Sequence, residues 1–145
     1  MNKKVIDALR LVVADTYALI GQTHICHWNV RGPSFFSLHT AFELQYTELF
    51  TAVDEIAERI RALGALAPGG LSNLAGMAGI DEIKEDASAQ DMVNHLVMAN
   101  EKLLADLAVA RDLAGEAGDS ESEDLMIGRM QIHQKTVWML KSYLG

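Results

Sequence analysis

The chain has 145 residues, half of them hydrophobic, and its 20 acidic and 12 basic side chains give a formal net charge of −8. This length is enough for one domain with a core of its own, and we expect residues 1–145 to form it. The acidic balance argues against non-specific binding to nucleic acid and suits a protein that handles cations. The single cysteine, Cys26, excludes an internal disulfide, and no apolar run approaches membrane-spanning length. Together these features favour the cytoplasm.

In chain order, the first predicted helix runs from about residue 4 to residue 31. Its apolar stripe begins at Ile6 and continues in register to His27, so His27 projects from the buried face. Gly32 and Pro33 are a strong stop signal. The second helix is expected to start at a Ser34 cap, and no helix-breaking residue interrupts it between residues 35 and 63.

The next segment, residues 65–87, is rich in glycine and alanine and has to cross from one helix pair to the other. It is long for a plain loop, so a short helix is predicted at about 71–77. The sequence therefore predicts an all-α fold of two helical hairpins joined by one long crossover. That is the layout of a ferritin-like four-helix bundle.

Capping signals mark the last two helices. Ser88 followed by Asp91 resembles a capping box at the start of the third helix, which Gly118 closes. Ser120 followed by Glu123 predicts a similar start for the fourth helix.

Five side chains at the end of the first helix and along the second are of the kinds that bind metals. His39 and Glu43 are four residues apart, which places them one helical turn above each other. Imidazole and carboxylate ligands, in a chain with a single thiol, suit iron, manganese or zinc rather than a soft metal. The candidate ligands are His27, His39, Glu43, Asp54 and Glu58.

The spacing of these residues predicts a site shared between two chains. His39 and Glu58 are nineteen residues apart, which is about 28 Å along a helix, so one metal cannot touch both within a chain. Positions 39, 43, 54 and 58 nevertheless lie within about 100° of arc on one face. The pairs 39/58 and 43/54 share one midpoint, between Glu48 and Leu49. An antiparallel copy about a two-fold axis at that midpoint would create two shared metal sites per dimer.

The same residues resemble a known signature. HWNVRGP at 27–33, His39 and DEIAER at 54–59 are similar to the pattern of the Dps family (DNA-binding protein from starved cells), small ferritin-like iron proteins of bacteria. The likeness extends over nearly the whole chain, including the crossover and TVWML near the end. It implies a dodecameric cage of two-fold dimers with iron sites at the dimer interfaces. It also implies that Fe(II) is oxidised, usually by hydrogen peroxide, and stored as a ferric mineral.

Carried over by position, both histidines and Glu43 come from one chain, and Asp54 and Glu58 from its mate. The family usually has aspartate at position 43, and Glu43 keeps the carboxylate with a longer reach. Two ferrous ions reacting with one peroxide transfer two electrons together and release no hydroxyl radical. Trp28, beside the first ligand, could intercept a stray radical or could simply pack at the dimer contact, and the sequence leaves both open.

An acidic run follows the third helix, at residues 116–124. Such a run is usually a solvated helix start, where carboxylates favour the helix dipole. In the family, the corresponding region lines the three-fold pores through which iron enters, so both interpretations stand. The pore candidates are Asp119, Glu121, Glu123 and Asp124.

The remaining histidines and the cysteine are expected to be structural. His133 lies on an apolar stripe, and His95 has no acidic partner at helical spacing. His24, one turn before His27, could add a secondary ligand, although a buried hydrogen-bonding role is favoured. Cys26 is expected to be an inert packing residue.

Three other functions are alternatives. An intrachain di-iron enzyme needs Glu-x-x-His pairs, and no histidine here has a glutamate three residues before it. A DNA-compacting, stress-protecting role is the family's namesake activity, but it relies on a basic tail, and only Lys3 and Lys4 precede the first helix. DNA is therefore not an expected partner. A helical scaffold without chemistry would be distinguished by a failure to bind iron.

Overall fold

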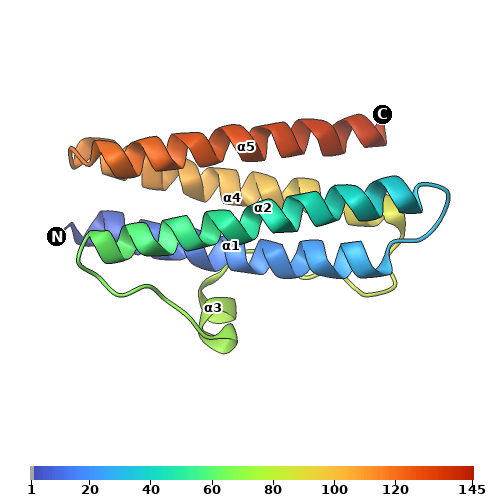
Figure 1. Cartoon of the computed structure of the whole chain (residues 1–145), viewed down its shortest axis with the longest axis horizontal. Helices are drawn as coiled ribbons and strands as arrows, with labels where there is room; N and C mark the ends of the chain where they lie inside the picture. The colour runs from blue at the N-terminus through green and yellow to red at the C-terminus, as the bar shows by residue number, and fades with distance from the viewer. Residues whose placement is uncertain (1) are drawn as a thin grey trace.

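The computed structural model describes residues 2–145, and in that part of the chain all regular structure is helical. Four long helices lie side by side, and the crossover from the second long helix to the third carries the short α3 (Figure 1). This confirms the predicted bundle layout. The helices are α1 (Lys3–Asn29), α2 (Phe35–Ala62), α3 (Leu71–Met77), α4 (Ala89–Glu116) and α5 (Ser120–Leu144).

Helix α1 begins where the Asn2 side chain accepts a hydrogen bond from the Val5 backbone N–H. Its predicted stripe is buried along the whole helix, and it ends one turn after Cys26. The chain then turns at Gly32, whose φ of +111° is a left-handed conformation that a side chain would strain.

Helix α2 runs without a break from Phe35 to Ala62, as predicted. Ser34 occupies the N-cap position, but its side chain makes no capping hydrogen bond. Gly64, with φ +95°, follows the C-terminus. The candidate ligands His39 and Glu58 therefore lie near opposite ends of one straight rod.

The predicted cap of α4 is confirmed, because Ser88 Oγ accepts from the Asp91 N–H at 3.1 Å. The predicted cap of α5 is wrong. Asp119, not Ser120, is the N-cap, and its Oδ1 accepts from the Ser122 N–H at 3.1 Å. A carboxylate suits this position because it also accepts from Arg59 Nη2 of α2, at 2.9 Å. Asp119 thus caps one helix and ties it to another.

The core is built from the apolar stripes of the four long helices. Three residues of these stripes are only partly buried: Leu63 and Leu113 near helix ends, and Met130 in the middle of α5. Each fully buried large side chain contributes about 1.5–3 kcal/mol relative to exposure. Among the helices of residues 2–145, none combines the length and the apolar character that a membrane-spanning helix needs. The largest buried apolar side chains are Phe42, Leu9, Leu19, Ile56, Ile60, Met92, Leu96, Leu103, Leu107 and Met126.

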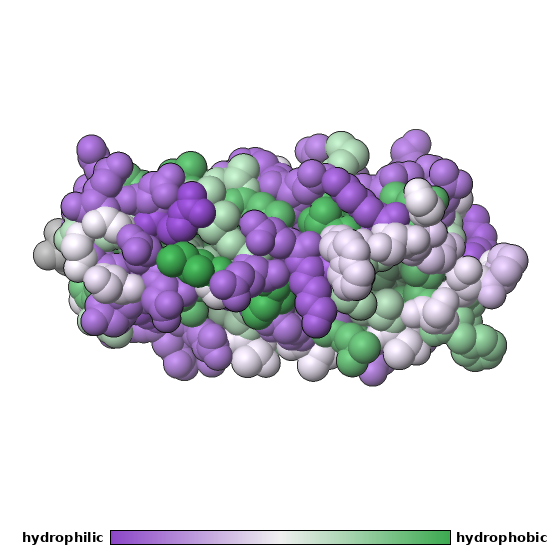
Figure 2. All heavy atoms as spheres, turned by 90° about the horizontal axis from the view of Figure 1, so that it is seen from above, coloured by the Kyte–Doolittle hydropathy of each residue, from purple (hydrophilic) through white to green (hydrophobic). Residues whose placement is uncertain are grey.

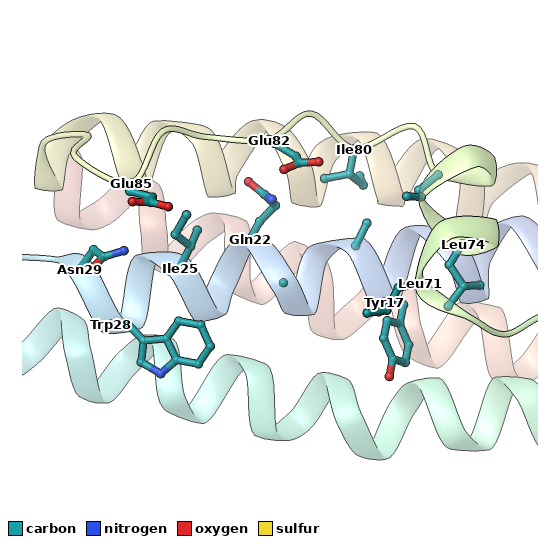
Figure 3. A pocket seen from close by; sticks show the side chains of 14 residues that line it. Tyr17, Gln22, Ile25, Trp28, Asn29, Leu71, Leu74, Ile80, Glu82 and Glu85 are labelled. Carbon is teal, nitrogen blue, oxygen red and sulfur yellow. The ribbon is translucent and has the colours of Figure 1, made fainter.

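The crossover is held along α1 by two polar side chains. Asp15 Oδ1 accepts from the Gly79 N–H, and Gln22 Oε1 accepts from the Ile83 N–H, each at 2.8 Å. Gln22 Oε1 also faces His95 Nε2 at 2.9 Å, which confirms a structural role for His95. Beside these anchors, a groove of about 530 Å³ remains open between α1 and the crossover (Figure 3).

Seen from the α5 side, the surface mixes hydrophilic and hydrophobic patches (Figure 2). Exposed apolar side chains of α5 include Ile127, Ile132, Trp138 and Met139.

Candidate metal centre

His27 and His39 form the best-defined part of the candidate site. The C-terminal turn of α1 and the first turns of α2 bring their rings face to face, with centroids 3.8 Å apart and planes 13° from parallel. Each Nδ1 bonds to the other residue's backbone carbonyl oxygen at 2.7 Å. A carbonyl only accepts, so each Nδ1 carries a hydrogen, and the neutral form of such a ring has its lone pair on Nε2. This is the tautomer that metal-binding histidines commonly adopt.

Glu43 adds a carboxylate to this pair. Its Oε1 lies 3.8 Å from His27 Nε2, while the His27 side chain is 7% exposed and that of Glu43 is 58% exposed. The histidine is thus held in place by the fold, and the carboxylate reaches over it from the surface. Within one chain, the structure brings His27 next to both His39 and Glu43.

Asp54 and Glu58 lie elsewhere. Both are exposed on the C-terminal half of α2, and Asp54 is eleven residues, or about 16 Å, beyond Glu43. Asp54 instead lines a cavity of about 300 Å³ with Tyr17 and residues 68–71 of the crossover. Across residues 2–145, no group of three or more His, Cys, Asp or Glu side chains could hold a metal ion. The five candidate ligands thus form two separate groups.

Large apolar side chains are exposed around the ligands. Phe36 is 84% exposed, Trp28 66% and Phe50 44%. Apolar side chains clustered on a surface that also carries polar functional groups are typical of a protein–protein interface.

Beside the histidine pair lies an aromatic cluster that sequence reasoning missed. His24 stacks on Trp28, with centroids 4.8 Å apart, and packs against Tyr46 at 4.3 Å. Tyr46 also meets the ring of His27 edge-on at 5.2 Å. Burial, and then the proximity of His27, lowers the pKa of His24. His24 therefore packs among aromatic rings and is half-buried, rather than buried as expected.

Trp28 also borders the groove between α1 and the crossover. Figure 3 shows its indole pointing from α1 toward α2, away from the crossover, whereas Gln22 points toward the crossover. Cys26, two residues earlier, is fully buried, and burial raises the pKa of its thiol to about 12. The thiol is inert packing, as predicted.

The acidic pore candidates differ in their surroundings. Asp119 is engaged by Arg59 and Ser122, and although burial opposes its ionisation, these hydrogen bonds lower the pKa of its carboxyl. Glu123 lies directly over Gly115, where any added side chain would collide with its carboxylate. Glu121 and Asp124 are exposed. Two of the four carboxylates thus face solvent freely.

A family model described as a ferritin-like domain matches residues 6–145. DNA protection during starvation protein 2 of Bacillus anthracis is 37% identical over 145 residues, covering 100% of this chain and 99% of that protein. The chain belongs to the Dps family of ferritin-like proteins. General stress protein 20U of Bacillus subtilis is 32% identical, covering 100% of both chains.

Solved structures of Dps proteins have the same fold as this chain. Dps from Staphylococcus aureus has a TM-score of 0.96 at 38% identity, covering 99% of this chain and 97% of that one. A Dps protein of Vibrio cholerae, described as a member of a broad superfamily of ferritin-like diiron-carboxylate proteins, has a TM-score of 0.95 at 34% identity, covering 99% of this chain and 90% of that one. The predicted family and fold are confirmed, and Dps membership points to stress protection and iron handling.

Proposed function

We propose that this Dps-family chain is a ferroxidase, which oxidises Fe(II) with hydrogen peroxide at sites shared between two-fold-related chains. The ferric product is stored inside a dodecameric cage in the cytoplasm. The observation that carries the proposal is the half-site on one chain. There, the Nδ1 atoms of two histidines are held by backbone carbonyls, which leaves both Nε2 atoms free of these bonds, and His27 Nε2 lies 3.8 Å from Glu43 Oε1.

The unbroken α2 supports the sharing of the site. Because the helix is one straight rod, an antiparallel copy about the midpoint between Glu48 and Leu49 places His39 opposite the partner's Glu58. Glu43 then faces the partner's Asp54. The same contact would cover exposed apolar surface at Phe36 and Phe50, which lie on this face of α2.

The chemistry assigned to each residue follows from its type. The three carboxylates attract Fe(II) and bind the harder Fe(III) product more strongly, while the imidazoles supply neutral nitrogen donors. Two Fe(II), one hydrogen peroxide and two protons give two Fe(III) and two waters, so both electrons are used and no radical leaves. Trp28, stacked close by, could donate an electron to a stray hydroxyl radical.

Stopped-flow absorbance of the ferric product tests the activity. We expect a rate above the protein-free control, and a faster one with peroxide than with air. Asp54→Asn with Glu58→Gln should lower that rate toward the control, since both side chains are exposed and the substitutions keep their shape. Glu55→Gln, an exposed carboxylate on another side of α2, is the matched control. If neither oxidant gives a rate above the control in the unmodified protein, the proposal is wrong.

Mixed dimers test whether each metal site is shared between two chains. One variant lacks His27 and His39, the other lacks Asp54 and Glu58, and each alone should be nearly inactive. On co-assembly, one site of each mixed dimer combines the intact histidines of the second chain with the intact carboxylates of the first. Activity should return, up to one live site per mixed dimer, with tagged pull-down confirming that mixed dimers form. Background activity in confirmed mixed dimers rules out the two-fold arrangement.

A further inference from the structure

A second polar network joins α2, α4 and α5, away from the α2 face that carries His39, Glu43, Asp54 and Glu58. Two of its side chains, Glu48 and His133, are of types that bind metals. Arg129 of α5 is only 4% exposed and forms a two-pronged ion pair with Glu48 of α2 through Nη1–Oε2 and Nη2–Oε1. The same Nη2 lies 3.0 Å from His133 Nε2. His133 Nδ1 in turn lies 2.8 Å from Asn100 Oδ1, and Asn100 Nδ2 donates to the Leu96 carbonyl at 2.7 Å.

These contacts determine the state of His133. Asn100 presents its carbonyl oxygen, so His133 Nδ1 carries the hydrogen and Nε2 accepts from Arg129. Burial, reinforced by the charge of Arg129, lowers the pKa of His133 to about 3, so the ring is neutral at pH 7. His133 therefore has the same tautomer as His27 and His39, with the hydrogen on Nδ1 bonded to a carbonyl oxygen and the lone pair on Nε2.

The position of Nη2 is that of a bound cation. It sits 2.9 Å from Glu48 Oε1 and 3.0 Å from His133 Nε2, between a carboxylate and an imidazole. These are the donor types that iron, manganese and zinc accept. Small ions can also approach, because Glu48 lines one cavity of about 290 Å³ with His133 and another of about 350 Å³ with Arg129.

We propose that Arg129 is a specificity-determining residue whose guanidinium takes the cation position between Glu48 and His133 and so excludes divalent metal from the bundle interior. The guanidinium stays charged at every relevant pH and is tethered to α5, so an incoming ion must displace it or share one carboxylate with it. Metal is then confined to the α2 face, where His27 Nε2 faces the carboxylate of Glu43. This role is separate from iron oxidation, and it can be tested with metals that undergo no oxidation.

The test removes the tethered cation. In an Asp54→Asn, Glu58→Gln background, Arg129→Ala should take up one additional Co²⁺ per chain, with d–d absorption bands that report nitrogen and oxygen ligands. Its affinity should exceed that of the Arg129 parent by roughly tenfold or more. Zn²⁺ should raise the Tm of Arg129→Ala and leave that of the parent unchanged. Adding His133→Gln should remove both effects. Arg59→Ala, which breaks a different ion pair, is the matched control and should gain no metal.

Two results would overturn the proposal. One is a folded Arg129→Ala chain that takes up no additional Co²⁺. The other is anomalous scattering from Zn²⁺ next to His133 Nε2 in soaked crystals of the unmodified protein. If circular dichroism shows Arg129→Ala to be unfolded, it is refolded from denaturant with and without Zn²⁺. Recovery only with Zn²⁺ supports the assignment, and failure in both conditions contradicts it.

Discussion

The substitution Asp15→Asn should change how the stability of the fold depends on pH. The side chain is fully buried in α1, and its Oδ1 accepts from the Gly79 N–H of the crossover. Its Oδ2 is also buried and has no donor within reach. The neighbour of Asp15 is Asp106 of α4. Lys102 Nζ donates to both carboxylate oxygens of Asp106, at 3.0 and 2.9 Å. Two adjacent carboxyls hydrogen-bond only if one carries a proton, and the buried Asp15 is the one that keeps it.

The size of the expected change in unfolding free energy follows from the pKa of Asp15. Burial first, and then the Asp106 carboxylate, raises the pKa of Asp15 from 3.8 to about 7. The folded chain therefore keeps a proton that the unfolded chain releases above about pH 4. The stability from this proton is complete below pH 4 and is lost as the pH rises toward 7. The loss is at most about 1.4 kcal/mol per pH unit, or about 4 kcal/mol in total.

Asp15→Asn should remove this pH dependence. The amide oxygen still accepts from Gly79, and the amide nitrogen donates to Asp106 at every pH. The variant should match the unmodified protein near pH 4 and exceed its stability by a few kcal/mol at pH 8. Urea unfolding at pH 5, 6, 7 and 8 and one protein concentration measures the difference, with assembly common to both proteins. Asp112→Asn, an exposed carboxylate of α4, is the control and should show no such trend.

A stability difference between Asp15→Asn and the unmodified protein that stays constant from pH 5 to pH 8 would contradict the raised pKa of Asp15. A constant difference would mean that Asp15 has the same protonation state in the folded and unfolded chains over this range.

Three further predictions concern function. With a net charge of −8 per chain, the protein should not retard supercoiled plasmid at neutral pH with a chelator present, and full retention in a gel shift would show a DNA-binding surface. Glu121→Gln with Asp124→Asn should slow mineral growth at low salt while iron still binds at the α2 face, because these exposed carboxylates would concentrate Fe(II) at a pore. Unchanged uptake kinetics would leave the acidic run as a solvated helix start. Trp28→Phe should abolish an indole radical in spin-resonance spectra after Fe(II) and peroxide, whereas a purely packing role predicts the same spectrum and a weaker dimer.

Most of the fold could be read from the sequence because it depends on local signals. Apolar periodicity, the Gly32 turn and the Ser88 cap each act within a few residues, and each is confirmed. The predicted cap of α5 is wrong for the opposite reason. Asp119 displaces Ser120 as the cap because it also pairs with Arg59, sixty residues away, and no local pattern reveals that partner.

The candidate site divides in the same way. The helical spacing of the ligands was visible, and the half-site on one chain has the expected His27–Glu43 proximity. The reciprocal bonds between His27 and His39 were not predictable, because each joins a side chain to a backbone carbonyl twelve residues away. Tyr46, which packs against two histidines, was missed although it lies on α2 one turn beyond Glu43.

What a histidine does in this bundle depends on what its Nε2 faces. At His27, Nε2 faces the carboxylate of Glu43 at the surface, the setting in which a metal can bind. At His133, the ring has the same tautomer, but Nε2 faces the guanidinium of Arg129. At His95, Nε2 faces an amide oxygen and so carries the hydrogen, which leaves no lone pair there for a metal. Replacing Arg129 should therefore change the metal content of the protein, whereas replacing Gln22 should only loosen the crossover.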